Sequence, residues 1–202
     1  MAAMTFLSRL LGLTRDIIFA NYFGVSNGTD AFFVAFKIPN FMRRLFAEGA
    51  FSQAFVPVFS EYKETRSFDD LKDLVNHVAG SLGGFLLILS TIGSLSAPLL
   101  VYVFAPGFAD ESRFQLTADM LAITFPYIFF IALTAFAGGI LNSYNKFAVP
   151  AFTPVLLNLS LISAALWGAD YFEQPIMALA WGVALAGFLQ LLFQTPFLAK
   201  LR

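Results

Sequence analysis

The sequence of 202 residues contains no cysteine, only one histidine, and charged residues at only 12% of its positions. The absence of cysteine excludes disulfides and thiolate metal sites. The single histidine, His77, argues against membrane lipid phosphatases that use histidines as nucleophile and acid, and no Walker-type phosphate loop is present. The net charge of −1, without a basic surface stripe, argues against nucleic-acid binding. We therefore expect no cofactor, no metal and no nucleic-acid partner.

The sequence is rich in apolar residues, which make up 58% of it and include 26 Phe, and its mean hydropathy is +0.75. A membrane-spanning helix needs about 20 mainly apolar residues to cross ~30 Å of hydrocarbon. Several stretches reach this length, which predicts an all-α polytopic membrane protein. We expect a single six-helix transmembrane bundle over residues 1–202, with spans at about 2–23, 31–59, 77–104, 118–142, 149–168 and 175–198.

The connections between the spans indicate an orientation, because Lys and Arg accumulate on the cytoplasmic side of membrane proteins. With the N-terminus inside, the outer loops contain only Arg113, among acidic residues. Both termini are therefore predicted to be cytoplasmic. The basic residues then found on the inside are Lys63, Arg66, Lys72, Lys146, Lys200 and Arg202. The polar connection from Glu61 to Asn76 is expected to be a solvated amphipathic helix.

Charges occur inside the first two spans, whereas the other four are free of them apart from their ends. Charged side chains at membrane depth normally face a cavity, a partner or a substrate. At 100° per residue, the acidic and basic residues of the second span form one stripe, with Asn40 near its edge and Arg43 on another side. The apolar residues of this span contribute about −7 kcal/mol to insertion, whereas four central charges cost about +12 kcal/mol. The stripe therefore cannot face lipid. The charged residues concerned are Arg9, Arg15, Asp16, Asp30, Lys37, Arg43, Arg44 and Glu48.

Two interpretations of these charges remain open. In the first, an ion-pair network locks the two helices together, with Glu48 or Asp30 as the acids. In the second, guanidinium groups remain available for a ligand, since basic residues outnumber acidic ones. Seven-residue spacing places Arg9 with Asp16 and Ser8 with Arg15, so one ion pair would not neutralise both arginines.

Arginines in a membrane cavity suit an anion, because the planar guanidinium donates two parallel hydrogen bonds to phosphate and stays charged. A polyprenyl-diphosphate lipid fits this chemistry. An organic anion or an acidic peptide satisfies the same electrostatics, and an anion channel is a further alternative. No repeated element that could form a selectivity ring is readable in the sequence.

Two long motifs carry a family resemblance. They are the runs SRLLGLTRDIIFANYFG and TDAFFVAFKIPNFMRRLFAEGAFSQAFVPVFSEYK, which are followed by APGF at Ala105–Phe108 and TFPYI at Thr124–Ile128. This pattern resembles the amino-terminal signature of the MurJ (MviN) family. This family comprises the bacterial lipid II flippases of the multidrug/oligosaccharidyl-lipid/polysaccharide exporter superfamily. The similarity covers essentially the whole chain.

The resemblance implies a transporter of the bacterial inner membrane, not an enzyme, that moves the undecaprenyl-diphosphate-linked peptidoglycan precursor, lipid II, to the periplasmic leaflet during cell-wall biogenesis. Alternating access between two six-helix lobes is implied, and this chain resembles the first lobe. We expect a fragment of a longer protein, whose second lobe is its partner. The resemblance assigns the diphosphate to Arg9, Arg15 and Arg43. Cavity or gating positions are then Ser8, Asp16, Asp30, Lys37, Asn40, Arg44 and Glu48.

Small residues in the helices suggest two further roles. Gly12, Gly24, Gly28 and Pro39 are candidate hinge points in the first two spans. The pairs Gly80 with Gly84 and Gly182 with Ala186 have the four-residue spacing that lets membrane helices approach closely.

Overall fold

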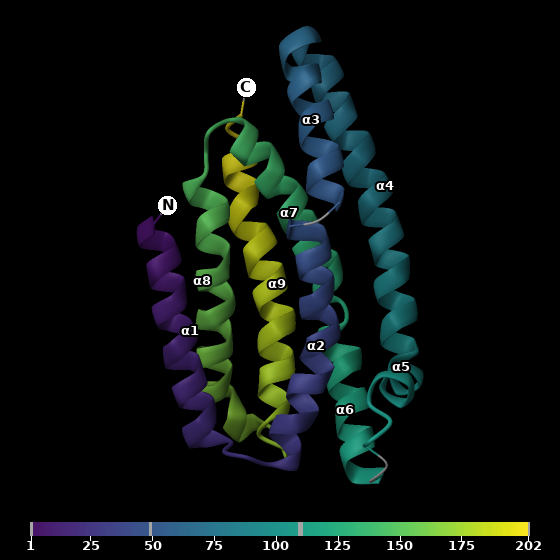
Figure 1. The fold of residues 1–202 in the computed structure, drawn as a ribbon, viewed down its shortest axis with the longest axis vertical. Coiled ribbons are helices and arrows are strands. Elements are labelled where there is room, and N and C mark those ends of the chain that lie inside the picture. The colour runs from purple at the N-terminus through teal and green to yellow at the C-terminus, as the bar shows by residue number, and fades with distance from the viewer. Residues whose placement is uncertain (1, 49, 109–110, 202) are drawn as a thin grey trace.

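The computed structural model describes the backbone of residues 2–48, 50–108 and 111–201 and the side chains of 4–41, 53–108 and 112–201. Within these ranges every regular element is a helix, which confirms the all-α prediction (Figure 1). The elements are α1 (Ala2–Tyr22), α2 (Asn27–Glu48), α3 (Ala50–Thr65), α4 (Phe68–Leu95), α5 (Ala97–Phe104), α6 (Glu111–Thr124), α7 (Tyr127–Ser143), α8 (Ala148–Ser163), a π-helical turn (Ala164–Gly168), a 3-10 turn (Ala169–Tyr171) and α9 (Met177–Leu198).

Local sequence explains where several of these helices begin and end. Ser67 caps α4 by accepting a hydrogen bond from the backbone N–H of Asp70, whose carboxylate accepts one in return from the N–H of Ser67. Pro126 separates α6 from α7. Gly24 ends the first helical segment with a φ of +58°, a conformation that glycine adopts without steric cost.

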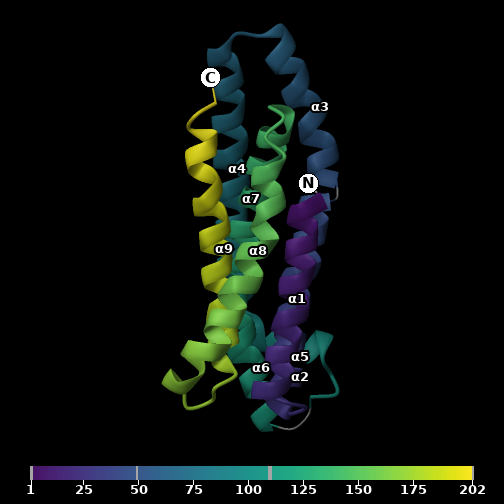
Figure 2. The ribbon, with the colours of Figure 1, turned by 90° about the vertical axis from the view of Figure 1, so that its left-hand side faces the viewer.

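The long helices run roughly parallel to one axis (Figures 1 and 2), and α9 has its most extensive contacts with α7 and α8. Helix α1 packs along α8, and α2 packs along α6 and α7. The main hydrophobic core surrounds Tyr127, Leu121 and Leu179, all of which are almost completely buried. Residues of α1 and α2 line a cavity together with residues of α7, α8 and α9.

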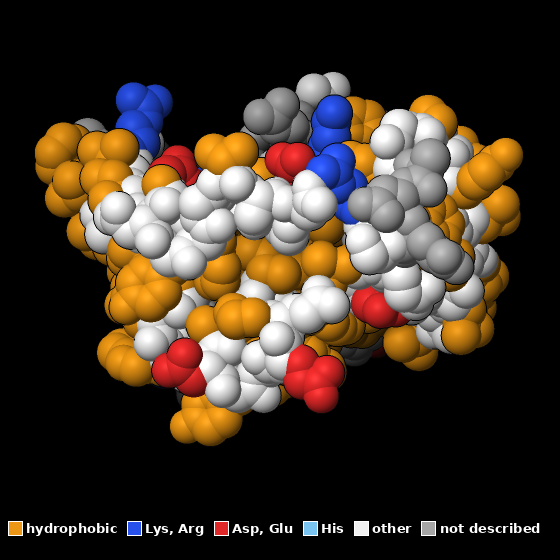
Figure 3. Space-filling view, turned by 90° about the horizontal axis from the view of Figure 1, so that it is seen from below, with side chains coloured by type: hydrophobic (Ala, Val, Ile, Leu, Met, Phe, Trp, Pro, Cys, Tyr) orange, Lys and Arg blue, Asp and Glu red, His pale blue; other side chains and the backbone are white. Residues whose placement is uncertain are grey.

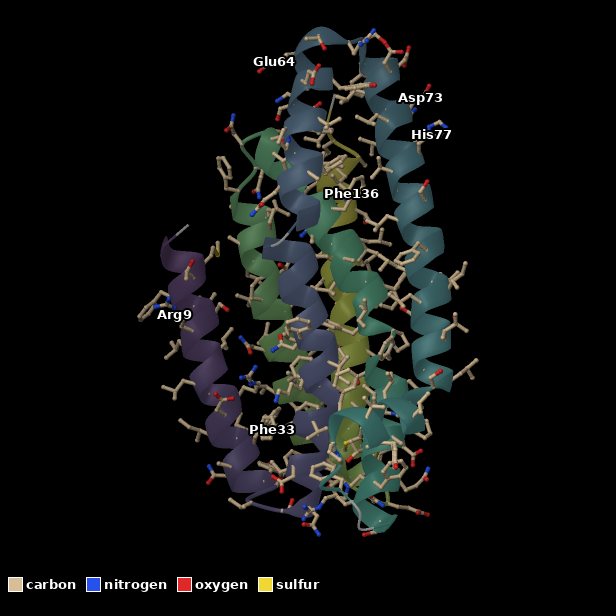
Figure 4. All side chains as sticks on the ribbon, turned by 45° about the vertical axis from the view of Figure 1, so that its right-hand side comes forward. Arg9, Phe33, Glu64, Asp73, His77 and Phe136 are labelled. Carbon is tan, nitrogen blue, oxygen red and sulfur yellow. The ribbon has the colours of Figure 1, made fainter. Side chains whose placement is uncertain are left out.

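Helices α3 and α4 form a hairpin that extends beyond the other helices at one end of the molecule (Figure 1). The polar connection from Glu61 to Asn76 is helical in this structure except at Arg66 and Ser67. Glu64, Asp73 and His77 project from the outer part of this hairpin (Figure 4). A second core cluster, which includes Phe55, Phe59 and Phe136, attaches the base of the hairpin to α7.

Four helical stretches are long and apolar enough to cross a membrane: Phe68–Leu95, Ser112–Ser143, Ala148–Tyr171 and Met177–Leu198. The more polar α1 and α2 are not among them. Large apolar side chains such as Phe85, Ile92 and Leu95 are exposed on the outer face of α4. Seen from the end opposite the hairpin, hydrophobic side chains cover much of the periphery and charged ones are few (Figure 3). Such an outer surface suits contact with lipid.

The two small-residue pairs behave differently. A Cβ at Gly182 would lie 2.8 Å from Cβ of Ala164, so this glycine does allow close packing of α9 on the π-helical turn. At Gly80 and Gly84, in contrast, a Cβ would meet no atom within 4 Å. The prediction of close packing is therefore wrong for Gly80 and Gly84 within the described part of the chain, because no described helix covers the face of α4 that carries them.

Candidate functional site

A cavity of about 660 Å³ lies between α1, α2, α7, α8 and α9. Its lining combines aromatic residues of α1 and α2 with amide and hydroxyl side chains of α7, α8 and α9. Arg15 supplies the formal charge among these lining residues. The polar lining residues are Arg15, Asn40, Thr134, Asn142, Thr153, Asn158, Gln190 and Gln194.

Arg15 is held at the cavity wall by two neighbours. Its Nε and Nη2 atoms donate to Oδ1 of Asp16 at 3.0 and 2.7 Å, and its Nη1 atom donates to Oδ1 of Asn158 at 3.0 Å. The side chain of Arg15 is 25% exposed, whereas that of Asp16 is 62% exposed. A guanidinium carries five N–H donors, and these three bonds leave two of them for a ligand oxygen. The guanidinium of Arg15 is thus held in one orientation and its charge is partly neutralised by Asp16, but it still has N–H groups that can donate to a ligand.

Asn158 joins α1 to α8 through both ends of its amide. Its Oδ1 atom accepts the hydrogen bond from Arg15, and its Nδ2 atom donates to the backbone carbonyl of Ser8 at 3.1 Å. Asn158 is only 6% exposed. A buried amide with both ends hydrogen-bonded fixes the rotation of α1 about its own axis, and this rotation turns Arg15 toward the cavity.

The wall formed by α8 and α9 contains buried but uncharged polar groups. Nε2 of Gln190 donates to the backbone carbonyl of Thr153 at 2.8 Å, and the hydroxyl of Tyr127 donates to Oε1 of Gln190 at 3.3 Å. One helical turn later, Gln194 is 1% exposed, and its Oε1 atom has no hydrogen-bond partner among the described residues.

The structure separates the predicted site residues into two groups. Of these, Arg15 and Asn40 line the cavity, beside Asn158, which was not among the predicted site residues. Arg9 is exposed and points away from α2, whereas Phe33 lies in the gap between α1 and α2 and lines the cavity (Figure 4).

The remaining predicted residues are more dispersed. Asp30 lies in the first turn of α2, and both Asp30 and Lys37 have exposed side chains. Ser8 is half-buried and contributes its backbone carbonyl to Asn158. The predicted site residues Arg43, Arg44 and Glu48 lie outside the described side chains.

The ion-pair network suggested for the first two helices takes a different form among the described residues. The ion pair there joins Arg15 to Asp16, its neighbour in α1, and not to Asp30 of α2. Helical spacing places Asp16 with Arg9, because spacing reflects the directions of the Cβ atoms alone. A long Arg side chain can turn back along the helix to reach an adjacent carboxylate.

Sequence reasoning missed the amides of the later spans. Asn158, Gln190 and Gln194 carry no charge, so a search for ionisable residues passes over them. The sequence could have indicated them, because uncharged polar residues within apolar membrane helices usually face the interior of the bundle. Gln190 and Gln194 also have the four-residue spacing that places both on one face of α9.

Comparison with known proteins gives one consistent family. The family model described as "Lipid II flippase MurJ" matches residues 19–202. The chain is 48% identical over 200 residues to the lipid II flippase MurJ of Burkholderia cenocepacia, covering 98% of the chain and 39% of that protein. It is 43% identical over 199 residues to the probable lipid II flippase MurJ of Buchnera aphidicola, again covering 98% of the chain and 39% of the relative.

A solved structure described as "Lipid II flippase MurJ, inward closed conformation" superposes on the whole chain with a TM-score of 0.85 and 34% sequence identity. The chain covers 42% of that structure. The chain therefore spans about two fifths of the length of the relatives it matches, a coverage consistent with an amino-terminal lobe.

Proposed function

The chain belongs to the MurJ family of lipid II flippases, and from this membership we propose that it forms the amino-terminal lobe of a transporter for lipid II. In this proposal, the lipid-linked peptidoglycan precursor moves from the cytoplasmic to the periplasmic leaflet by alternating access between two lobes. The tail stays in the bilayer while the headgroup crosses through the cavity.

The position of Arg15 is the observation that carries the proposal for this lobe. Its guanidinium lines the cavity, is oriented by Asp16 and Asn158, and retains N–H donors. Guanidinium groups form strong, charge-assisted hydrogen bonds with phosphate oxygens. We assign Arg15 to the diphosphate of the substrate.

We also assign Arg9 and Arg43 to the proposed diphosphate site. Arg9 is exposed on α1 and is available to the cavity that forms between this lobe and the second one. Asp16, Asp30, Lys37, Asn40, Arg44 and Glu48, together with Ser8, have proposed roles in gating or in cavity structure. We also place both ends of this chain on the cytoplasmic side.

Binding of undecaprenyl diphosphate to the purified two-lobe protein tests the assignment of Arg15. We expect saturable binding by the parent and a loss of affinity of about 10- to 100-fold in Arg15→Ala, because a charge-assisted pair of hydrogen bonds is removed. Arg15→Lys should recover only part of the affinity, since an ammonium group cannot bind bidentately.

The matched control is Arg66→Ala, which removes an exposed arginine at the tip of the α3–α4 hairpin. It should bind as the parent does. Equal affinity of Arg15→Ala and the parent, with both proteins folded, would refute the assignment of Arg15 to the diphosphate.

A further inference from the structure

Gln194 is the feature of the cavity that the proposed diphosphate site does not use. It comes from the last part of α9 and lines the cavity together with Gly138, Asn142 and Pro150. Its side chain is 1% exposed, and its carbonyl oxygen Oε1 is unpaired among the described residues. Burying an unpaired carbonyl costs free energy that an apolar residue of similar volume would avoid. Packing alone therefore does not account for a glutamine at this position.

Gln190 provides the contrast within the same helix. Both ends of its amide are hydrogen-bonded, to Tyr127 and to the backbone of Thr153, so its role is to join α7, α8 and α9. Gln194 has the same side chain one turn away, but its carbonyl has no such bond to any described residue. The acceptor of Gln194 is therefore unused among the described residues, and a rotation of the side chain can present it to a ligand in the cavity.

The distance between Gln194 and Arg15 suits two parts of one headgroup. Asn158 marks the level of Arg15 along α8. Pro150 marks the level of Gln194, because a Cβ at Gly138 would lie 3.3 Å from Cβ of Pro150 and 3.9 Å from Nε2 of Gln194. These two α8 positions are separated by about 12 Å at ~1.5 Å per residue. A sugar attached to a diphosphate at Arg15 can span this separation.

The polar side chains around Gln194 favour binding of a neutral group that is rich in hydroxyls. Asn142, Thr153 and Gln194 offer amide and hydroxyl groups that both donate and accept hydrogen bonds, without a formal charge. Such a wall suits the hydroxyl and acetamido groups of a sugar, whereas a phosphate would gain more at Arg15.

Building on the proposed function, we infer that Gln194 forms a sugar subsite in the cavity, which accepts a hydrogen bond from the glycan part of the headgroup while Arg15 holds the diphosphate. The subsite adds selectivity for glycan-bearing lipids over the bare lipid diphosphate. The flexible Gln194 side chain turns its carbonyl toward the cavity when the sugar enters.

The test compares two probes on the two-lobe protein: undecaprenyl diphosphate, and the same lipid bearing an N-acetylated disaccharide. In Gln194→Met we expect affinity for the glycan-bearing lipid to fall about three- to tenfold, which corresponds to one lost hydrogen bond. Affinity for the bare lipid should be unchanged. Thermal stability should be equal to or higher than that of the parent, because an unpaired buried carbonyl has been removed. Gln174→Met, at an exposed loop position, should leave both affinities unchanged.

The outcomes separate the two proposals. Three results overturn the sugar subsite alone. In the first, Gln194→Met binds both lipids with unchanged affinity, and in the second, the parent binds both lipids equally well. In the third, Gln194→Met loses affinity equally for both lipids and is also less stable. A parent that binds neither lipid overturns the proposed function, and the subsite with it. If Gln194→Met does not fold, Gln194→Leu is measured against the same criteria.

Discussion

At the scale of single residues, Asn158 decides how the first helix presents its charges. The amide bonds both the guanidinium of Arg15 and the backbone of Ser8 from a position on α8. An amide buried in this way is costly to remove, since each of its partners then loses a hydrogen bond. The orientation of Arg15 therefore depends on a residue far away in the sequence.

We predict that Asn158→Ala destabilises the two-lobe protein by about 1.5–3 kcal/mol, the range expected for loss of a hydrogen bond to a charged group. Thermal unfolding in detergent would measure the change. Leu159→Ala, at an adjacent and 42% exposed position, is the control and should cost less. Equal effects of the two substitutions would show that the amide does not hold α1 to α8.

At the scale of the helices, one face of α4 packs closely against the bundle and another face is open. Gly93 is buried, and a Cβ there would overlap the ring of Phe125, with the nearest ring atom 1.9 Å away. Gly84 lies on the same helix with no atom within 4 Å of such a Cβ. The same residue type thus permits close packing at one position and leaves an open surface at the other.

Substitution by alanine should have different effects at these two glycines. Gly93→Ala should destabilise the protein by about 1–3 kcal/mol, because the buried ring of Phe125 must move. Gly84→Ala should be neutral or stabilise by up to about 1 kcal/mol, since alanine has the higher helix propensity. Thermal unfolding of both variants checks the prediction, and a stable Gly93→Ala protein would contradict it.

At the scale of the whole molecule, the α3–α4 hairpin and the connection between α7 and α8 lie at the same end (Figure 1). Nζ of Lys63 donates to the carbonyl of Ser143 at 2.7 Å and lies 4.1 Å from the ring centroid of Tyr144. Basic residues near this end fit its proposed placement on the cytoplasmic side.

Cysteine labelling tests this orientation, because the chain has no cysteine of its own. In the two-lobe protein with any other cysteines replaced, Tyr171→Cys should react with a membrane-impermeant maleimide in spheroplasts. Glu64→Cys and Lys146→Cys should react only after the membrane is permeabilised. All three positions are exposed, so burial does not confuse the result. The reverse pattern would invert the proposed topology.

The sequence by itself determined the class of the protein and the region of its site. Apolar length and composition dictate membrane helices, and charges within the first two spans must avoid lipid. Together with the two long motifs, these features predicted the family that the comparisons confirm. The sequence identified Arg15 as one of three arginines proposed to bind the diphosphate, but it did not distinguish Arg15 from Arg9 and Arg43.

Only the tertiary structure decided which charges and which amides share the cavity. Packing of α1 on α8 through Asn158 turns Arg15 inward and leaves Arg9 on the opposite side. The pairing of Arg15 with Asp16 depends on side-chain rotation, which helical spacing does not encode. The carbonyl of Gln194, which has no partner among the described residues, is buried only when α7, α8 and α9 are brought together, because burial is a property of the packed bundle and not of any one helix.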